Sequence, residues 1–505
     1  MDILFGALSM IMQGDVLLII TLSAIFGMVV GAIPGLSATM AVALLVPVTF
    51  YMDPLPAIGA IVTAAAMAIF AGDIPSALIR IPGTPASAAY IDDAYSLTLK
   101  GRAAEALGIG LGFSAVGGIF GALVLAVAAP SLAHFALRFS SYEYFWLALL
   151  GLSCTALVSG NSLLKGAGSL LIGLWLSTIG LGAVGGAPRF TFGSTELLGG
   201  IPLVPALVGM FAIPELIRYA LAPEMNGKVV TDAVSGVARL MFRSLATNIP
   251  GLLRGSFLGI IVGILPAAGA GVASWMAYAI ARKFSRHPEE FGQGSVEGIA
   301  ESGAANNAAL GGTWVPALVF GIPGDAITAI AIGVLMMKGI SPGPLVFVNS
   351  PDVMYGIFLI FLLANVAMIP LGLLVIKGAV KIIQIDRSIL MPIVLLFCLV
   401  GSYAMNNTAF AIGLMLAVGV LAFFMEENGF PVAPAILGLV LGQMLEENFV
   451  ISMAKAQGDI LQLFSRPISL ALGLLTISIW IYPVLAAVWC NAKRRNLFVS
   501  NAERQ

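Results

Sequence analysis

Proline and hydroxyl residues interrupt the apolar segments of this sequence at four places. The first is the run FGMVVGAIPGLSATMA, where Pro34 and Gly35 are followed closely by Ser37 and Thr39. Proline lacks a backbone donor and clashes with the preceding turn, so a helix that reaches Pro34 is expected to break there. A broken helix leaves free amides at one end, which can bind an anion, and free carbonyls at the other, which can bind a cation. The sequence therefore predicts a ligand-binding site at helix ends.

Three further breaks have the same character. Pro82 and Pro323 each stand in an Ile-Pro-Gly motif, and Pro266 lies in LGIIVGILPAAGAGVAS. A single break of this kind could be a packing kink, but four with hydroxyl residues nearby favour a binding site. The predicted substrate-binding residues are Pro34, Gly35, Ser37, Thr39, Arg80, Pro82, Gly83, Thr84, Ser87, Gly269, Gly271, Ser274, Pro323 and Gly324. The predicted ion-coupling residues are Asn306, Asn307, Asp325 and Thr328.

Charged and amide residues near the breaks have more than one interpretation. Arg80 could bind a substrate carboxylate through two hydrogen bonds, pair with Asp73, or reach the membrane surface. Asp325 follows the fourth break, and an ionised carboxylate at membrane depth costs about 2.5–3.5 kcal/mol. It is therefore either a proton or cation site or an interfacial residue, and the same alternatives hold for Asp73. The adjacent Asn306 and Asn307 could either ligate an ion or join two helices.

Patterns typical of enzymes are missing from the sequence. Asp92 and Asp93 would suit a metal–diphosphate enzyme, but no second acidic cluster follows, and we predict a solvated connection that caps the next helix. There is no nucleophile elbow, Walker loop or zinc motif. The three cysteines lie in apolar segments without the spacing of metal ligands. We expect no enzymatic activity, no cofactor, no metal site apart from a coupling Na⁺, and no nucleic-acid partner.

The composition indicates the kind of elements that must position these residues. The chain has 505 residues, of which 59% are hydrophobic and only 10% are charged, whereas soluble domains carry about 25% charged residues. A bilayer crossing takes about 20 apolar residues, which leaves room for roughly a dozen crossings or partial crossings. Continuous apolar runs without alternation exclude a transmembrane β-barrel. The predicted fold is an all-α polytopic membrane protein.

An internal repeat organises the chain. Pro34 and its neighbours match Pro266, and the Ile-Pro-Gly motif at Pro82 matches the one at Pro323. Two later landmarks recur in the same order: Asn161-Ser162 resembles Asn407-Thr408, and IPLVPALVG from 201 resembles FPVAPAILG from 430. Ordered self-similarity of this kind indicates a duplication. We predict a first transmembrane repeat at 1–220, a cytoplasmic linker at 221–250, a second repeat at 251–447, and an extra helix with a basic tail at 448–505.

The basic residues predict how the two repeats are oriented. The linker and the tail are rich in Lys and Arg, which places both in the cytoplasm. The last helix then puts the connection before it outside, so the second repeat crosses an odd number of times. An equal count in the first repeat places the N-terminus in the periplasm. The repeats are thus expected to be inverted, as in many secondary transporters.

The third break is predicted to be the tip of a re-entrant hairpin. Arg254 precedes it and Arg282 follows it, so both ends of the segment lie on the cytoplasmic side. By symmetry, 33–39 would be the tip of a hairpin that enters from outside. Irregular backbone at membrane depth survives only where it lines protein or a wet cavity. The tips are therefore expected to meet at a cavity near the middle of the membrane.

Several motifs together resemble a known transporter family. GAIPGLSATMA, IPGTPAS, DDAYSLTLKGRAAEALG and PVAPAILGLVLG are similar to the large membrane subunit of the tripartite tricarboxylate transporters. The resemblance implies a multi-pass protein of the bacterial inner membrane that takes up citrate or another small organic carboxylate by symport with Na⁺ or H⁺. It also implies an elevator-type mechanism, a small four-helix membrane subunit and a periplasmic solute-binding protein. The alternatives are a passive organic-anion channel and a membrane-embedded enzyme.

Overall fold

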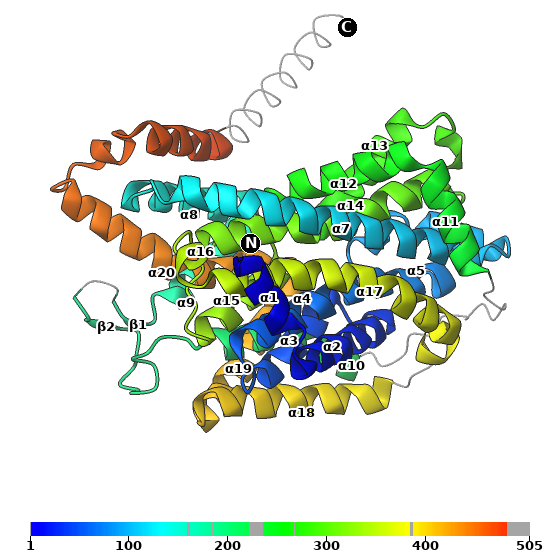
Figure 1. Cartoon of the computed structure of the whole chain (residues 1–505). Helices are drawn as coiled ribbons and strands as arrows, with labels where there is room; N and C mark the ends of the chain where they lie inside the picture. Colours follow the sequence, from blue (N-terminus) through cyan, green and yellow to red (C-terminus); the bar gives the residue numbers. More distant parts are fainter. Residues whose placement is uncertain are drawn as a thin grey trace, which may run out of the picture.

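The chain folds into a bundle of helices that lie at several angles to one another, as the computed structural model in Figure 1 shows. The structure describes residues 2–158, 162–182, 185–221, 236–266, 268–383 and 387–481. Asn161, most of the predicted linker and the basic tail, which were used above to predict the repeat and its orientation, lie outside these ranges.

Almost all described elements are α-helices. They are α1 (Asp2–Ile11), α2 (Gly14–Ala32), α3 (Ala38–Thr49), α4 (Pro54–Ala71), α5 (Asp73–Ile79), α6 (Ile91–Leu99), α7 (Ala103–Ala136), α8 (Ser141–Val158), α9 (Leu163–Ser177), α10 (Leu203–Leu221), α11 (Val237–Thr247), α12 (Ile249–Ile264), α13 (Gly269–Phe284), α14 (Val296–Phe320), α15 (Ala326–Met337), α16 (Val346–Asn349), α17 (Pro351–Ile383), α18 (Arg387–Asn406), α19 (Ala409–Glu427) and α20 (Val432–Lys455). Three short 3₁₀ helices, η1 (Ser87–Ala89), η2 (Pro288–Glu290) and η3 (Ile460–Phe464), and a hairpin of β1 (Gly180–Leu181) and β2 (Pro188–Arg189) accompany them. A further apolar helix spans Pro467–Ile481. This small hairpin was not expected in an all-α chain.

The helices have the length and composition of a membrane protein. Among the described residues, seven spans are long and apolar enough to cross a bilayer, one of them formed by α4 and α5 together over Pro54–Ile79. Five shorter apolar helices accompany them. Helices α11 and α12 meet at an angle of 84° and add one further candidate, a bent pair. The prediction of a polytopic, helical membrane protein is therefore confirmed, with several of the expected crossings present as short helices.

The breaks at Pro34 and Pro266 have the same local structure. Helix α2 ends at Ala32, where Ile33 turns to an extended conformation and donates its amide to the carbonyl of Val30. Helix α12 ends in the same way, with Leu265 extended and bonded to Val262. New helices, α3 and α13, begin a few residues later. Proline therefore interrupts both helices where the sequence predicted.

The breaks at Pro82 and Pro323 also form an equivalent pair. Helix α5 ends with Arg80 in the left-handed conformation (φ 55°), and the amide of Ile81 bonds to the carbonyl of Pro75. Helix α14 ends with Gly321 at φ 70°, and Ile322 bonds to Pro316 in the same way. Both are Schellman-type ends, which satisfy carbonyls that the last turn would leave free. Pro82 and Pro323 follow each end directly.

Glycine contacts join α2 and α12 each to a buried helix. A Cβ on Gly27 of α2 would lie 2.5 Å from the carbonyl oxygen of Ala64 on α4, and one on Gly259 of α12 would lie 2.4 Å from that of Ala305 on α14. One turn further, the contact recurs at Gly31 against Ala68 and at Gly263 against Ala309. Only glycine permits such close backbone approach between helices. The pairs α2–α4 and α12–α14 thus pack through matching positions of the duplicated sequence.

Two long helices cover the paired elements and hold them together. Helix α4 lies at the centre, since every residue from Leu55 to Ala71 is buried. Helix α7 packs along α14, and α17 packs against both α4 and α7. Helix α20 packs against α8 and α9, while α10 packs against α19 (Figure 1). At the four breaks, Ile33 and Ile322 are buried, whereas Arg80, Pro82 and Leu265 are exposed.

Candidate functional site

The four breaks surround one cavity of about 410 Å³. Gly271 from the third break lies against Pro85 of the second, since a Cβ on Gly271 would lie 3.3 Å from the Pro85 side chain. Gly269 approaches Asp325 of the fourth break equally closely, at 3.1 Å, and adopts φ 53°, so that a side chain there would be strained as well as crowded. The predicted residues that line the cavity are Ser37, Thr39, Thr84, Gly269, Gly271, Asn306 and Asp325.

Three helix N-termini point at this cavity. Ala38, Gly269 and Ala326, the first residues of α3, α13 and α15, all lie in its wall. The first amides of a helix have no partner within the helix and carry about half a positive charge together. Three such ends around one space favour an anionic ligand such as a carboxylate. The remaining wall is apolar, with side chains that include Ile69, Val272, Trp275, Ile327, Ile436 and Leu437.

The loop of the second break is held rigidly at the cavity. The backbone amide of Thr84 donates to the Ser87 hydroxyl at 3.2 Å, and the amide of Ser87 donates to the Thr84 hydroxyl at 3.1 Å. Ser87 also bonds to Ser76 of α5 at 2.9 Å. Ser87 is therefore a supporting residue behind the wall, whereas Thr84 belongs to the wall itself. Gly83 permits the loop to touch the junction between α4 and α5, because a Cβ there would lie 2.5 Å from the Cα of Gly72.

Asp325 and Thr328 form the N-terminal cap of α15. Oδ1 of Asp325 accepts the backbone amide of Thr328 at 2.8 Å and its hydroxyl at 2.7 Å. The Asp325 amide in turn donates to the Thr328 hydroxyl at 2.9 Å, which completes a capping box. Thr328 is fully buried and lies outside the cavity wall, so its first role is structural. Asp325 serves the cap and also faces the cavity.

Asn306 and Asn307 are neighbours with different surroundings. Asn306 is fully buried, lines the cavity, and has no hydrogen-bond partner at either amide atom among the described residues. Leaving a buried polar group without a partner costs about 1–3 kcal/mol, so this side chain is poised for a ligand. Asn307 instead points at α17, where its amide nitrogen lies 3.6 Å from the sulfur of Met368. The structure therefore brings only one of the two asparagines to the site.

Two predicted side chains lie away from the cavity. Arg80 is exposed and pairs with Asp92, with 2.7 Å between Nη2 and Oδ1, instead of pairing with Asp73. Its position at the left-handed end of α5 turns the side chain outward. Ser274 is buried on α13 but donates its hydroxyl to the carbonyl of Ser302 on α14, at 3.1 Å. Pro34, Gly35, Pro82, Pro323 and Gly324 form the breaks without lining the cavity.

Asp93 was predicted in a solvated connection, and this prediction is wrong. Its side chain is fully buried, and Oδ1 accepts three backbone amides of the loop before α14, those of Gly292, Gly294 and Ser295, at 2.7–2.8 Å. Oδ2 accepts the hydroxyl of Tyr278 on α13 at 2.6 Å. The sequence held a signal, because Asp93 shares a helical face with apolar residues of α6. The carboxylate thus joins α6 to α13 and to the loop before α14.

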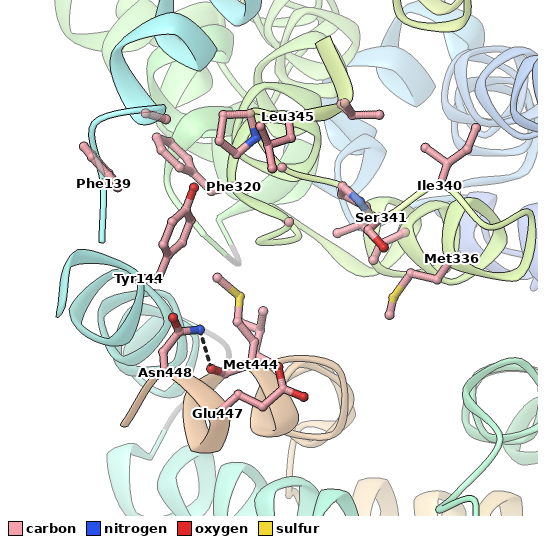
Figure 2. A pocket seen from close by; sticks show the side chains of 18 of the residues that line it. Phe139, Tyr144, Phe320, Met336, Ile340, Ser341, Leu345, Met444, Glu447 and Asn448 are labelled. Atoms are coloured by element: carbon pink, nitrogen blue, oxygen red, sulfur yellow. Dashed lines mark hydrogen bonds between the residues drawn. The ribbon is translucent and has the colours of Figure 1, made fainter. Parts of the chain in front are cut away.

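A larger cavity of about 760 Å³ lies elsewhere, at the C-terminal end of α14 (Figure 2). Aromatic side chains, among them Phe139, Tyr144 and Phe320, face Met444 and Glu447 of α20 across it. The ring of Phe139 stacks on that of Phe320 with 5.8 Å between centroids. No residue predicted to bind substrate or ion lies there, and the described helix that begins at its wall, α16, is only one turn long. The smaller cavity is therefore the candidate site.

Comparison with known proteins identifies the family. The Tripartite tricarboxylate transporter TctA family matches residues 17–437, a segment that contains all four breaks. The chain belongs to this family. TctA is a transporter family, so membership points to a transporter subunit and not to an enzyme. In the described residues, no group of three His, Cys, Asp or Glu side chains is close enough to hold a metal ion.

Two relatives come from Agrobacterium vitis. One, described as "Uncharacterized 52.8 kDa protein in TAR-I ttuC' 3'region", is 35% identical over 486 residues, which covers 94% of each chain. The other, "Uncharacterized protein in TAR-II ttuC' 3'region", is 32% identical over 246 residues, which is 48% of this chain and 100% of that protein. No solved structure matches the chain.

Part of the TctA cavity wall comes from residues not predicted as a site. Ala433, Ile436 and Leu437 of α20 line the cavity beside the helix N-termini. They belong to the repeated motif FPVAPAILG, so the duplication marked the segment without indicating a binding role. Trp275, in the second turn of α13, was likewise not predicted. Apolar side chains carry no local signal that separates a cavity wall from ordinary core packing.

Proposed function

We propose that this chain is the membrane subunit of a binding-protein-dependent symporter that takes up citrate-like tricarboxylates or other small organic carboxylates. A Na⁺ or H⁺ gradient would drive the uptake. The observation that supports the proposal most directly is the meeting of three helix N-termini at one cavity. The first-turn amides that the caps Ser37 and Asp325 leave free suit carboxylate groups. The volume of about 410 Å³ lies in the range of small-molecule sites.

The proposed binding arrangement assigns a role to each part of the wall. The first amides of α3, α13 and α15 would bind carboxylate oxygens, and the hydroxyls of Ser37, Thr39 and Thr84 would add directional hydrogen bonds. The apolar side chains would contact the carbon skeleton. Asn306 would donate or accept one further hydrogen bond, since neither of its amide atoms has a partner among the described residues.

The proposed mechanism uses the duplicated elements. We propose that 1–220 and 251–447 are inverted repeats and that their broken helices move together against a scaffold, as in an elevator. The equivalent helix ends at Pro34 and Pro266, and the equivalent glycine contacts on α4 and α14, support the duplication. In this arrangement the N-terminus is periplasmic and the C-terminus cytoplasmic, in a bacterial inner membrane. A small four-helix membrane subunit and a periplasmic solute-binding protein complete the transporter.

Reconstitution tests the proposal. The chain, its small membrane partner and the binding protein are placed in proteoliposomes, and uptake of labelled citrate and of smaller dicarboxylates is measured with and without ion gradients. We expect saturable uptake that needs a gradient, together with exchange between internal and external substrate. Flux that does not saturate and shows no exchange would instead indicate a passive channel. Unchanged accumulation after both the Na⁺ and H⁺ gradients are collapsed would refute ion coupling.

Variants of the wall connect the activity to this cavity. Ser37→Ala and Thr84→Ala each remove one hydroxyl from the wall without removing a charge. Both should lower the apparent affinity for carboxylate while leaving the protein in the membrane. Ser131→Ala is the matched control, because its exposed hydroxyl on α7 bonds only to the carbonyl of Val127. Wild-type kinetics in both wall variants would place the substrate elsewhere.

A further inference from the structure

A second buried carboxylate lies directly behind the candidate site. Asp73 is the first residue of α5 and is only 4% exposed. Its Oδ1 accepts the hydroxyl of Tyr90 at 2.5 Å. Its Oδ2 has no hydrogen-bond partner in the described part of the chain. An ionised carboxylate buried in this way costs several kcal/mol unless a counter-charge or a proton compensates it.

No positive charge of the described residues compensates Asp73. Tyr90 is the titratable side chain that faces it, and no charged group interacts with it from the elements packed around α5. Arg80, which is seven residues away, is committed to Asp92. The other ionisable residues on the packed elements are Asp15 of α2, Asp92, Asp93 and Tyr95 of α6, Glu105 and His134 of α7, and Asp352, Tyr355, Lys377 and Lys381 of α17. None of these interacts with the Asp73 carboxylate.

The space beside Oδ2 suits a proton better than a metal ion. Helix α7 passes so close that a Cβ on Gly110 would lie 3.1 Å from Oδ2. Hard metal cations gather several oxygen ligands around themselves, and α7 occupies the side where such ligands would stand. A proton needs no ligand shell and neutralises the carboxylate where it is.

Two contacts connect Asp73 to the cavity. Asn306 lies beside the Tyr90 hydroxyl and also in the cavity wall. Gly72 packs directly against Thr84 of the wall, because a Cβ on Gly72 would lie 2.7 Å from the Thr84 methyl carbon. The loop that carries Thr84 continues through η1 to Tyr90. Tyr90 therefore stands between the Asp73 carboxylate and Asn306 of the wall. Along the chain, Gly72 stands between Asp73 and Thr84 of the wall.

We propose that Asp73 is the proton-binding site that couples carboxylate transport to proton movement. The inference rests on the proposed function and assigns the coupling ion. A proton from water binds Oδ2 and converts the carboxylate to a neutral carboxyl group, and the same proton returns to water on the other side of the membrane. The neutral form supplies a hydroxyl donor toward the unpartnered acceptor atoms nearby, while the ionised form keeps only the Tyr90 hydrogen bond.

The test separates coupling from transport. Asp73→Asn keeps the size of the side chain but can no longer gain or lose a proton. In the reconstituted complex, this variant should still exchange labelled internal carboxylate for external carboxylate, yet accumulation driven by an inward proton gradient should be lost. Asp92→Asn makes the same chemical change on an exposed residue of α6 and should accumulate substrate like the wild type. Proton-driven accumulation that survives in Asp73→Asn would overturn the proposal.

A spectroscopic measurement tests the site without transport. The infrared carbonyl band of a protonated carboxyl group is titrated against pH in the purified complex. A titrating band that disappears in Asp73→Asn and shifts its midpoint upward in Tyr90→Phe supports the proposal, because the Tyr90 hydroxyl stabilises the ionised form. An identical band in Asp73→Asn, or accumulation in the wild type that follows a Na⁺ gradient at equal pH, overturns it. Loss of substrate exchange in the wild type would contradict the proposed function itself, whatever the infrared result.

Discussion

Arg254 of α12 forms a two-pronged ion pair with the buried carboxylate of Glu301 on α14. Nε of Arg254 donates to Oε2 of Glu301 at 2.8 Å, while Nη2 bonds to Oε1, and the Glu301 side chain is 1% exposed. The pair ties the helix before the third break to the buried helix that carries Asn306. No equivalent pair joins α2 to α4, both of which the structure describes in full, because Leu22 and Ala60 occupy the matching positions. An ion pair therefore fastens α12 to α14 but not α2 to α4.

Removing one partner of this pair should destabilise the protein strongly. Arg254→Met leaves Glu301 buried without a counter-charge, which typically costs about 3–5 kcal/mol. The double variant Arg254→Met with Glu301→Met should recover much of that loss, because no buried charge remains. The thermal unfolding midpoint in detergent measures the loss in the single variant and the recovery in the double variant. Lys283→Met, at an exposed position of α13, is the control; a single variant as stable as this control would contradict the role of the pair.

The helix contact at Gly259 predicts a steric effect. Gly259→Ala places a methyl group 2.4 Å from the carbonyl oxygen of Ala305, and crowding of this kind usually costs about 1–3 kcal/mol. Gly413→Ala on α19 is the matched control, since nothing lies within 4 Å of its added Cβ and alanine favours a helix. The amount of folded, monodisperse protein and its unfolding midpoint should fall for the first variant only. Equal stability would mean that α12 and α14 do not pack this closely.

Arg80 provides a test of where the substrate binds. It adopts φ 55°, a conformation that costs a non-glycine residue about 1–2 kcal/mol, and glycine stands at the matching position 321. Its exposed pair with Asp92 contributes only about 0–1 kcal/mol. Arg80→Gly should therefore leave stability unchanged or slightly raised, and carboxylate affinity unchanged. A large loss of carboxylate affinity, measured by uptake kinetics, would mean that Arg80 binds the substrate.

Asn306 and Asn307 form a matched pair on adjacent positions of α14. Asn306→Ala should weaken carboxylate binding by about tenfold, which corresponds to about 1.4 kcal/mol, because the amide that faces the cavity is lost. Asn307→Ala should bind normally, since that side chain faces Met368. Binding is measured by calorimetry on the purified complex. Equal losses of binding in Asn306→Ala and Asn307→Ala would indicate that α14 rotates during transport, so that both side chains reach the cavity.

The buried carboxylate of Asp93 should hold the loop before α14. Asp93→Ala removes an acceptor for three backbone amides and the Tyr278 hydroxyl, and hydrogen bonds to a charged group contribute about 1.5–3 kcal/mol each. Amide exchange across 285–295 should become faster, together with cleavage by added protease. Asp92→Asn, one residue earlier and exposed, should change neither. Unchanged exchange in Asp93→Ala would show that the loop is fixed by other contacts.

Local sterics explain why the breaks were predictable from the sequence. Pro34, Pro82, Pro266 and Pro323 act on the turn that precedes them, so the helix ends appear where the prolines stand. The likeness between the breaks at Pro34 and Pro266 was visible for the same reason, because similar helix ends need similar local residues. Composition alone identified a membrane protein, since apolar segments of sufficient length have few alternatives.

The burial and the partners of individual polar side chains depended on contacts between residues far apart in the chain. Asn306 and Asn307 are indistinguishable in sequence, yet helix rotation turns one to the cavity and the other to α17. Asp93 follows Asp92 in a polar stretch, and the loop at 292–295 that folds over it makes it buried. A sequence records which residues can break a helix or carry a charge. Packing between distant helices decides which of them meet, because burial and partner choice are properties of the assembled fold.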